Sequence, residues 1–415
     1  MSRPEPALQP ADFDVKAIRV QFPILHESAR GKRLAYLDNA ATTQKPESVL
    51  RVLDDYYRHD NANVHRGVFE LAERATLAYE SARDRIAAFI HATREEIVFT
   101  RGTTEGVNLI ARSFLQPKLN AGDEILVTYM EHHSNIVSWQ LAAAGCGAKV
   151  VPAPVLDDGQ LDLDAWRGLL NERTRMVAVV HVSNTLGTVN PVAEMIAEAH
   201  ARSIPVLVDG AQAVAHLRVD VKALDADFYT FSAHKLFGPT GFGVLYAKRE
   251  HLEAMPPWHG GGDMIKTVSF EGSSWNDVPY KFEAGTPDIS GAVGTAAAID
   301  WINSVGFDDI QQHEHALLQD ATARLASIPG LRLIGTAPGK AGILSFVMEG
   351  AHPQDIGNVL DMEGVAVRTG HHCTMPLMQR FGIPGTVRAS LAVYNDQADL
   401  EQLEHGLHTV KRLFG

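Results

Sequence analysis

From about residue 45 to about residue 250, helical and strand patterns alternate along the chain. Short apolar runs at 124–128, 176–180 and 206–208 each end in polar or glycine-rich residues, as buried strands of a parallel sheet do. This alternation favours an α/β fold with helices on both faces of a mostly parallel sheet. We therefore expect ligand-binding loops at the carboxyl ends of the strands. The apolar stripe of one predicted helix consists of Leu71, Ala75, Ala78, Ala82, Ile86 and Phe89.

Beyond residue 255 the pattern changes. Residues 256–287 are rich in Gly, Pro, Trp and Ser, which predicts an irregular excursion at an active site or an interface. Two long helical patterns follow, then strands near 343–347 and 365–367, and finally an amphipathic helix. The C-terminal part is therefore expected to form a second, smaller domain.

The composition argues against several kinds of partner and site. The 415 residues carry a net charge of -13 without a basic cluster, so we expect no nucleic acid and no anionic membrane as partner. Residues 1–10 lack the pattern of a signal peptide and no apolar run is as long as a membrane span, which predicts a cytoplasmic protein. Two cysteines, Cys146 and Cys373, are too few for a disulfide framework. Adjacent histidines at 132–133 and 371–372 point different ways, so we expect no metal site.

Lys235 follows an apolar strand pattern at 228–231 and precedes a glycine-rich turn. A lysine held at a strand end, desolvated and near a cationic cofactor, should have a lowered pKa and serve as an amine nucleophile. Asp209 ends another apolar strand, which is the position that a pyridinium nitrogen needs for a charged partner. The pair indicates pyridoxal 5'-phosphate (PLP), although either residue alone could be a solvated lysine or a turn aspartate.

A phosphate site is predicted where residues 101–106 follow the strand pattern at 96–100 and open a helix. Helix N-termini offer free N–H groups to an anion. Thr103 or Thr104 can add a hydroxyl, and one of them can also be the helix N-cap. Ser232 and His234 flank the lysine and are placed to reach the same phosphate.

Together these residues resemble the cysteine desulfurases, fold-type I PLP enzymes of the class V aminotransferase group, and most closely their SufS-like branch. The match runs nearly end to end. Its most specific segments are 61–67, 101–105, 130–135, 181–184, 208–212, 232–235, 284–287 and 368–373.

The resemblance implies a large PLP-binding domain whose mostly parallel seven-stranded sheet lies between helices, and a smaller α+β C-terminal domain that carries Cys373. We expect the large domain to cover residues 28–305 and the small domain residues 306–415. Residues 1–27 are expected to form an N-terminal segment that packs with the small domain.

The resemblance also implies roles around the cofactor ring. Lys235 would carry the cofactor as a Schiff base, and His132 would stack over the pyridine ring and is a candidate for moving protons. Asp209 would pair with the ring N–H and keep it protonated. Gln212 would bind the phenolic oxygen, and Asn184 would lie close to the ring and the substrate.

Further roles concern the phosphate and the substrate. The phosphate would be held by Thr103, Thr104, Ser232 and His234, with Thr286 reaching it from the second subunit of a homodimer. Arg388 would clamp the substrate carboxylate with its planar fork, and Arg368 would support it.

Cys373 is the predicted nucleophile. His371 and His372 precede it and residues 374–377 resemble a helix start, so nearby positive charge is expected to favour the thiolate. A lone cysteine is otherwise most often buried and inert. The polar residues 368–372 argue against burial here.

The implied activity is removal of sulfur from L-cysteine as a Cys373 persulfide, with release of L-alanine. An acceptor protein of SufE or SufU type would take the sulfur toward iron-sulfur cluster assembly, with a scaffold complex as a further candidate partner. The short segment around Cys373 predicts slow turnover without an acceptor.

Other activities remain open. A selenocysteine lyase would use the same scaffold, whereas a PLP aminotransferase or a kynureninase-like hydrolase would not need Cys373. A purely structural role in sulfur-transfer assembly would leave the PLP residues unexplained.

Overall fold

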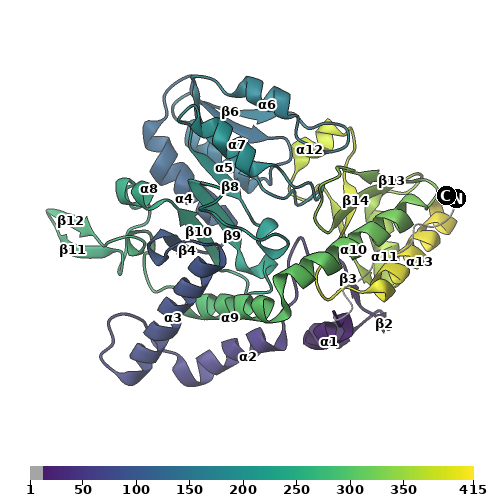
Figure 1. Ribbon diagram of the computed structural model, residues 1–415, viewed down its shortest axis with the longest axis horizontal. Coiled ribbons are helices and arrows are strands. Elements are labelled where there is room, and N and C mark those ends of the chain that lie inside the picture. The colour runs from purple at the N-terminus through teal and green to yellow at the C-terminus, as the bar shows by residue number, and fades with distance from the viewer. Residues whose placement is uncertain (1–12) are drawn as a thin grey trace.

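A seven-stranded sheet forms the centre of the protein in the computed structural model, which describes residues 13–415 (Figure 1). Its strands lie in the order β4 (Ile97–Thr100), β10 (Gly243–Ala247), β9 (Phe228–Ser232), β8 (Val206–Asp209), β7 (Thr174–Val180), β5 (Glu124–Thr128) and β6 (Lys149–Ala153). Only β10 runs against its neighbours. The prediction of an α/β fold with a mostly parallel seven-stranded sheet is confirmed.

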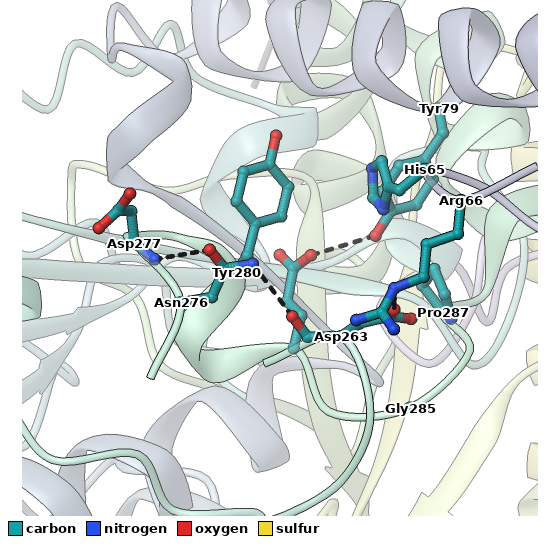
Figure 2. A pocket seen from close by; sticks show the side chains of 10 residues that line it. His65, Arg66, Tyr79, Asp263, Asn276, Asp277, Tyr280, Gly285 and Pro287 are labelled. Carbon is teal, nitrogen blue, oxygen red and sulfur yellow. Dashed lines mark hydrogen bonds and ion pairs between the residues drawn. The ribbon is translucent and has the colours of Figure 1, made fainter. Parts of the chain in front are cut away.

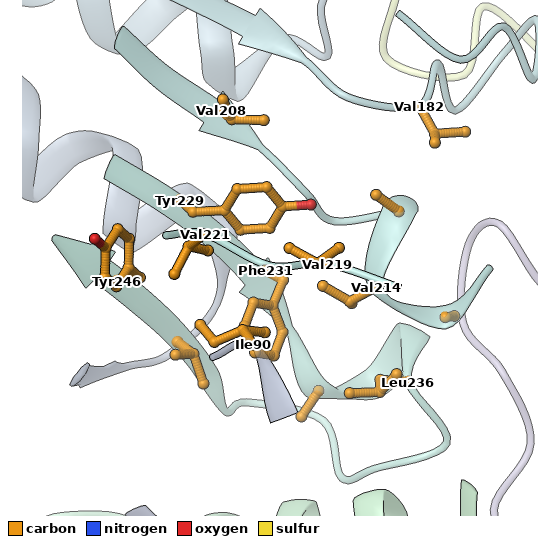
Figure 3. Close-up of a cluster of buried hydrophobic side chains, with 14 of the residues drawn as sticks. Ile90, Val182, Val208, Val214, Val219, Val221, Tyr229, Phe231, Leu236 and Tyr246 are labelled. Atoms are coloured by element: carbon orange, nitrogen blue, oxygen red, sulfur yellow. The ribbon is translucent and has the colours of Figure 1, made fainter. Parts of the chain in front are cut away.

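Helices cover both faces of this sheet. Alternate residues of a strand point to opposite faces, so Leu245 of β10 packs with helices α4 (Thr103–Leu109) and α5 (Ser134–Ala143). Its neighbours Val244 and Tyr246 pack on the other face, against α3 (Glu70–Phe89), α7 (Val192–His200) and α9 (Ile289–Val305). Figure 3 shows part of this second cluster, with Tyr229 and Phe231 of β9 at its centre. The sheet is therefore buried on both sides, which accounts for its nearly continuous apolar strands.

A separate four-stranded antiparallel sheet lies at the right of Figure 1. Its order is β13 (Leu331–Ile334), β14 (Ile343–Met348), β17 (Thr386–Ser390) and β16 (Arg368–Gly370). Helices α10 (Phe307–Ala326), α11 (Pro353–Met362) and α13 (Gln397–Phe414) pack around it. Gly306, at φ +98°, turns the chain between α9 and α10.

Shorter elements connect these layers. They are α1 (Val15–Val20), α2 (Glu47–Asp55), α6 (Leu163–Leu169), α8 (Arg249–Ala254), α12 (Met375–Arg380), β1 (Ser28–Ala29), β2 (Lys32–Arg33), β3 (Ala35–Tyr36) and β15 (Val365–Ala366). Strand β3 pairs in parallel with β15, so residues near position 38 lie beside the C-terminal sheet.

The N-terminal segment contacts both parts of the molecule. Arg19 of α1 forms an ion pair with Asp399 of α13 (3.1 Å), and Phe22 packs edge-on against Trp301 of α9. Residues 1–12 lie outside the described residues, and the domain boundaries at 27 and 305 stay a prediction.

Residues 256–287 are more regular than expected. They contain an exposed hairpin of β11 (Ile265–Ser269) and β12 (Gly272–Trp275), which projects from the body in Figure 1. Val268, Phe270 and Trp275 are exposed on it. The segment is thus irregular except at residues 265–275, where two short exposed strands pair around a turn at Phe270 and Glu271.

Among residues 13–415, no helix is both long enough and apolar enough to cross a bilayer.

Candidate active site

A cavity of about 240 Å³ opens where β7, β8 and β9 end. All of the predicted site residues except Thr286 line it: Thr103, Thr104, His132, Asn184, Asp209, Gln212, Ser232, His234, Lys235, Arg368, Cys373 and Arg388. Ligands bind at the carboxyl edge of such sheets, so the position agrees with the topology.

Lys235 and Asp209 lie at the ends of neighbouring strands. Lys235 ends a 3-10 turn directly after β9, and burial lowers the pKa of its amine. Burial raises the pKa of Asp209, whose carboxylate accepts a hydrogen bond from the Ala211 N–H (2.9 Å). The residue after Asp209 is a glycine, Gly210, and a Cβ at this position would collide with the Tyr229 ring. A buried acid with so little compensation fits a ligand that brings its own positive charge, as a pyridinium N–H does.

The N-terminal end of α4 forms the second side of the cavity. Thr103 N donates to Ser232 Oγ (2.9 Å), and the two hydroxyls lie 2.9 Å apart, which joins α4 to the end of β9. Strand β10 and the start of α4 also lie close together, since a Cβ on Gly243 would collide with the backbone of Gly102. Burial and Lys235 lower the pKa of His234 to about 4, so its ring is neutral. The hydroxyls of Thr103, Thr104 and Ser232 line the cavity at this helix end and fit a phosphate.

Three polar side chains surround the space between these two sides. His132 Nδ1 lies 2.8 Å from Ser134 Oγ, and burial together with Lys235 lowers the pKa of His132 to about 4, so it is a neutral imidazole. Gln212 Nε2 donates to Ala40 O (2.6 Å). Asn184 Nδ2 donates to His372 O (2.8 Å), while its buried Oδ1 has no partner within the described residues. That orphaned acceptor is available to a bound ligand.

Two arginines close the cavity from the C-terminal sheet. Arg388 of β17 is buried and donates to Asn184 O (2.9 Å) and to Asp38 Oδ1 (3.0 Å). Arg368 donates to Asp38 Oδ2 (3.1 Å). Asp38 therefore holds both guanidinium groups, which sequence reasoning missed, as it missed Ala40 and Ala41 in the cavity lining. The only signal is their place directly after the short strand β3.

Cys373 is half-buried in a loop between β16 and α12. His372 and Cys373 both have left-handed backbone, at φ +50° and +59°. Each such residue costs roughly 1–2 kcal/mol, so the loop is held by its surroundings. His133 N, for example, donates to Cys373 O (2.8 Å).

The expected source of positive charge at Cys373 needs correction. Burial lowers the pKa of His372 to about 3, so this ring is neutral, and its Nε2 lies 2.8 Å from Thr386 Oγ1. The cations that line the cavity with Cys373 are Lys235, Arg368 and Arg388. Sequence proximity identifies Arg368 but not Lys235 or Arg388, which reach the cavity from the end of β9 and from β17.

Thr286 is exposed and lies outside this cavity in the single chain. Its neighbours Gly285 and Pro287 line a second cavity of about 340 Å³, shown in Figure 2. Arg66 reaches Asp263 there (3.4 Å). Two of the motifs, 61–67 and 284–287, thus meet at a surface away from Lys235.

The fold and the lysine–aspartate pair together define a PLP enzyme of fold type I. The chain belongs to the aminotransferase class-V family, whose pattern matches residues 35–403, and PLP is its cofactor. A cysteine desulfurase from Dickeya dadantii is 51% identical over 405 residues, which cover 97% of this chain and 98% of that protein.

Solved structures agree with this grouping. The apo structure of a cysteine desulfurase from Thermococcus onnurineus NA1 superposes with a TM-score of 0.92 at 38% identity and covers 98% of this chain and 100% of that one. The cysteine desulfurase CsdA of Escherichia coli, with an S-sulfonic acid, has a TM-score of 0.90 at 40% identity over 97% of this chain and 100% of that one. Within its family the chain groups with the cysteine desulfurases.

Proposed function

We propose that this PLP-dependent cysteine desulfurase transfers the sulfur of L-cysteine to Cys373 and releases L-alanine. The observation that supports this most directly is that Cys373, Lys235 and Arg388 line one cavity of about 240 Å³. An amine, a carboxylate-binding group and a thiol are thereby within reach of one small amino acid.

The cofactor, when bound, supplies an electron sink for the charge that develops at the substrate Cα. From the end of β8, Asp209 would keep the ring nitrogen protonated. The phosphate would be held by Thr103, Thr104, Ser232 and His234. His132 and Gln212 would lie against the ring, and Asn184 would bind the substrate through its Oδ1, which has no partner within residues 13–415.

Lys235 is proposed to move the proton at the substrate Cα. Its Nζ is suited to this step because burial lowers the pKa of the amine and so favours the neutral base. Arg388 binds the substrate carboxylate, since it is fixed by Asp38 and Asn184, and Arg368 supports it through the same aspartate.

Cys373 then attacks the substrate sulfur as a thiolate. A lone pair of Cys373 Sγ forms the new S–S bond. The bond between the substrate Cβ and its sulfur breaks, and the electron pair of that bond stays on Cβ. A proton delivered to that carbon completes alanine.

Cysteine desulfurases pass their sulfur to acceptor proteins. For this chain we propose an acceptor of SufE or SufU type that serves iron-sulfur cluster assembly, with a scaffold complex as a further partner, in the cytoplasm. Because Cys373 lies on a short, internally bonded loop, the acceptor has to enter the cavity mouth. Turnover is therefore expected to be slow without it, and equal rates with and without any acceptor would contradict this.

We also propose that the enzyme is a homodimer in which Thr286 reaches the phosphate of the other subunit. The exposure of Thr286 and of the nearby apolar hairpin residues supports this. Light scattering measures the oligomeric state, and a fully active monomer would contradict the role of Thr286.

The central test compares native protein with Cys373→Ala and, as a matched control, Cys146→Ala. Alanine and sulfide release from L-cysteine is measured in the presence of a reductant. We expect native protein and Cys146→Ala to form both products and Cys373→Ala to form neither while it keeps its cofactor absorbance. Full activity of Cys373→Ala would refute the proposal.

A further inference from the structure

Two histidines without a role in the proposed chemistry lie beside the loop that carries Cys373. His133 stands at the N-terminal end of α5, and His371 lies two residues before Cys373. Their ring centroids are 5.4 Å apart. His371 is exposed and His133 is only partly buried, so filling the core does not explain either ring.

Each ring accepts a hydrogen bond from a backbone N–H of this loop, here taken to include Met375, the first residue of α12. Cys373 N donates to His371 Nδ1 (3.1 Å), and Met375 N donates to His133 Nε2 (3.1 Å). A backbone amide can only donate, so both accepting nitrogens carry no proton. Burial and the neighbouring His371 lower the pKa of His133, which favours its neutral form.

The same histidine binds the loop a second time through its backbone. His133 N donates to Cys373 O (2.8 Å), so the residue holds the loop at both Cys373 and Met375. The loop is thereby connected to the turn that carries His132, which lines the cavity.

Such support is needed because the loop backbone is strained. Two successive residues, His372 and Cys373, adopt the left-handed conformation without being glycine. A strained segment of this kind persists only where its surroundings determine it. If the acceptors were lost, the loop would relax and move Sγ.

We propose that His133 and His371 are positioning residues that clamp the Cys373 loop as hydrogen-bond acceptors and so aim Sγ at the substrate sulfur. The inference rests on the proposed role of Cys373 as nucleophile. The clamp acts on the attack and not on cysteine binding, because Arg388 and Lys235 are positioned by β17 and β9. Losing it therefore lowers kcat and leaves KM unchanged.

Four variants test the clamp. His133→Leu and His371→Leu remove the acceptor but keep an apolar side chain of comparable size. His133→Gln and His371→Asn keep an acceptor oxygen, the asparagine through an Asx turn to the Cys373 amide. His408→Leu, at an exposed histidine of α13, is the matched control.

We expect kcat for alanine formation to fall about five- to tenfold in the Leu variants, with KM within about twofold. The Gln and Asn variants should recover most of kcat, and His408→Leu should match native protein. Leu variants with native kcat, or Gln and Asn variants as slow as the Leu variants, would overturn the clamp. Should a Leu variant lose its cofactor absorbance, the Gln and Asn variants decide, and a fall in their kcat to the five- to tenfold range would overturn it.

Hydrogen exchange provides a readout that does not depend on turnover. The amides of Cys373 and Met375 should exchange faster in the Leu variants than in native protein or in His408→Leu. Unchanged exchange would overturn the clamp. Faster exchange together with full activity of Cys373→Ala would overturn the proposed function and with it the aiming of Sγ, while the support of the loop by the two histidines would still hold.

Discussion

Two buried aspartates on neighbouring strands have opposite electrostatic environments. Asp209 lies at the carboxyl end of β8. Asp227 lies directly before β9, at the amino ends of these parallel strands. Both are almost fully buried, at 2% and 5% exposure. Burial raises the pKa of Asp209, whereas hydrogen bonds from His251 and His200 hold the pKa of Asp227 well below its usual range despite burial.

The difference lies in what each carboxylate contacts. Asp227 binds His200 (2.8 Å), His251 (3.1 Å), Lys248 (3.2 Å) and the Val206 N–H (2.8 Å). Within residues 13–415, the Asp209 carboxylate accepts a hydrogen bond from the Ala211 N–H alone (2.9 Å). A perturbed pKa alone thus does not mark a functional acid. An acid whose charge the chain leaves uncompensated is the one prepared for a cationic ligand.

The largest expected effect separates the two acids by activity. Asp209→Asn should slow alanine formation about 10²–10³-fold, as loss of one preorganised charged group does. Asp227→Asn should leave kcat within about twofold, because Asp227 and its partners lie at the amino ends of the strands, away from the cavity. Steady-state assays on L-cysteine measure both, and equal losses in the two variants would break the comparison.

Stability should rank the two acids in the reverse order. Asp227→Asn leaves His251 without its carboxylate partner and leaves His200 and Lys248 with Asp225 alone, and it is expected to lower the free energy of unfolding by about 2–3 kcal/mol. This is below the value for a fully buried pair, because the three partners reach solvent in part. Urea unfolding of the PLP-free proteins at pH 7 measures it, with Asp209→Asn as the matched variant that should not be destabilised.

The dependence of stability on pH should also have opposite sign at the two sites. The folded pKa of Asp227 is depressed, so its contribution is present above the ordinary aspartate value of 3.8 and is lost as pH falls through the folded pKa. The folded pKa of Asp209 is raised, so in PLP-free protein its contribution is present below 3.8 and is lost as pH rises through the folded pKa.

Asp209→Asn cannot ionise, and the PLP-free variant should therefore gain stability relative to native protein as pH rises from acid to neutral. Melting temperatures across that range check this. A gap that stays constant with pH would show that Asp209 is already compensated without the cofactor.

The cofactor end of the site could be predicted because its residues follow strands directly. Asp209 and Lys235 each end an apolar run, and Thr103 begins a helix after another, so local pattern and sheet topology bring them together. Asp38 could not be predicted in this way. It reaches the arginines only because β3 pairs with β15, some 330 residues further along the chain.

The predicted stripe of α3 shows a second limit. The stripe predicts that Leu71 is buried, but its side chain is 41% exposed, while Arg83 on the same helix is fully buried. Arg83 is buried because Glu283, 200 residues away, binds it at 2.7 and 2.8 Å and because its guanidinium lies 4.0 Å from the Phe99 ring centroid. Apolar periodicity cannot find a buried cation whose partner is distant in sequence.

The smallest expected effect tests whether the partners of Asp227 act as one group. His200→Asn should lower the free energy of unfolding by only about 1 kcal/mol, since His251, Lys248 and the Val206 N–H still bind the carboxylate. In the Asp227→Asn background the same change should have almost no effect, because the acceptor is gone. A double-mutant cycle by urea unfolding measures this coupling. Additive losses would mean that His200 stabilises the fold through its other carboxylate, Asp225 (3.0 Å), and that Asp227 owes its depressed pKa to His251 and Lys248.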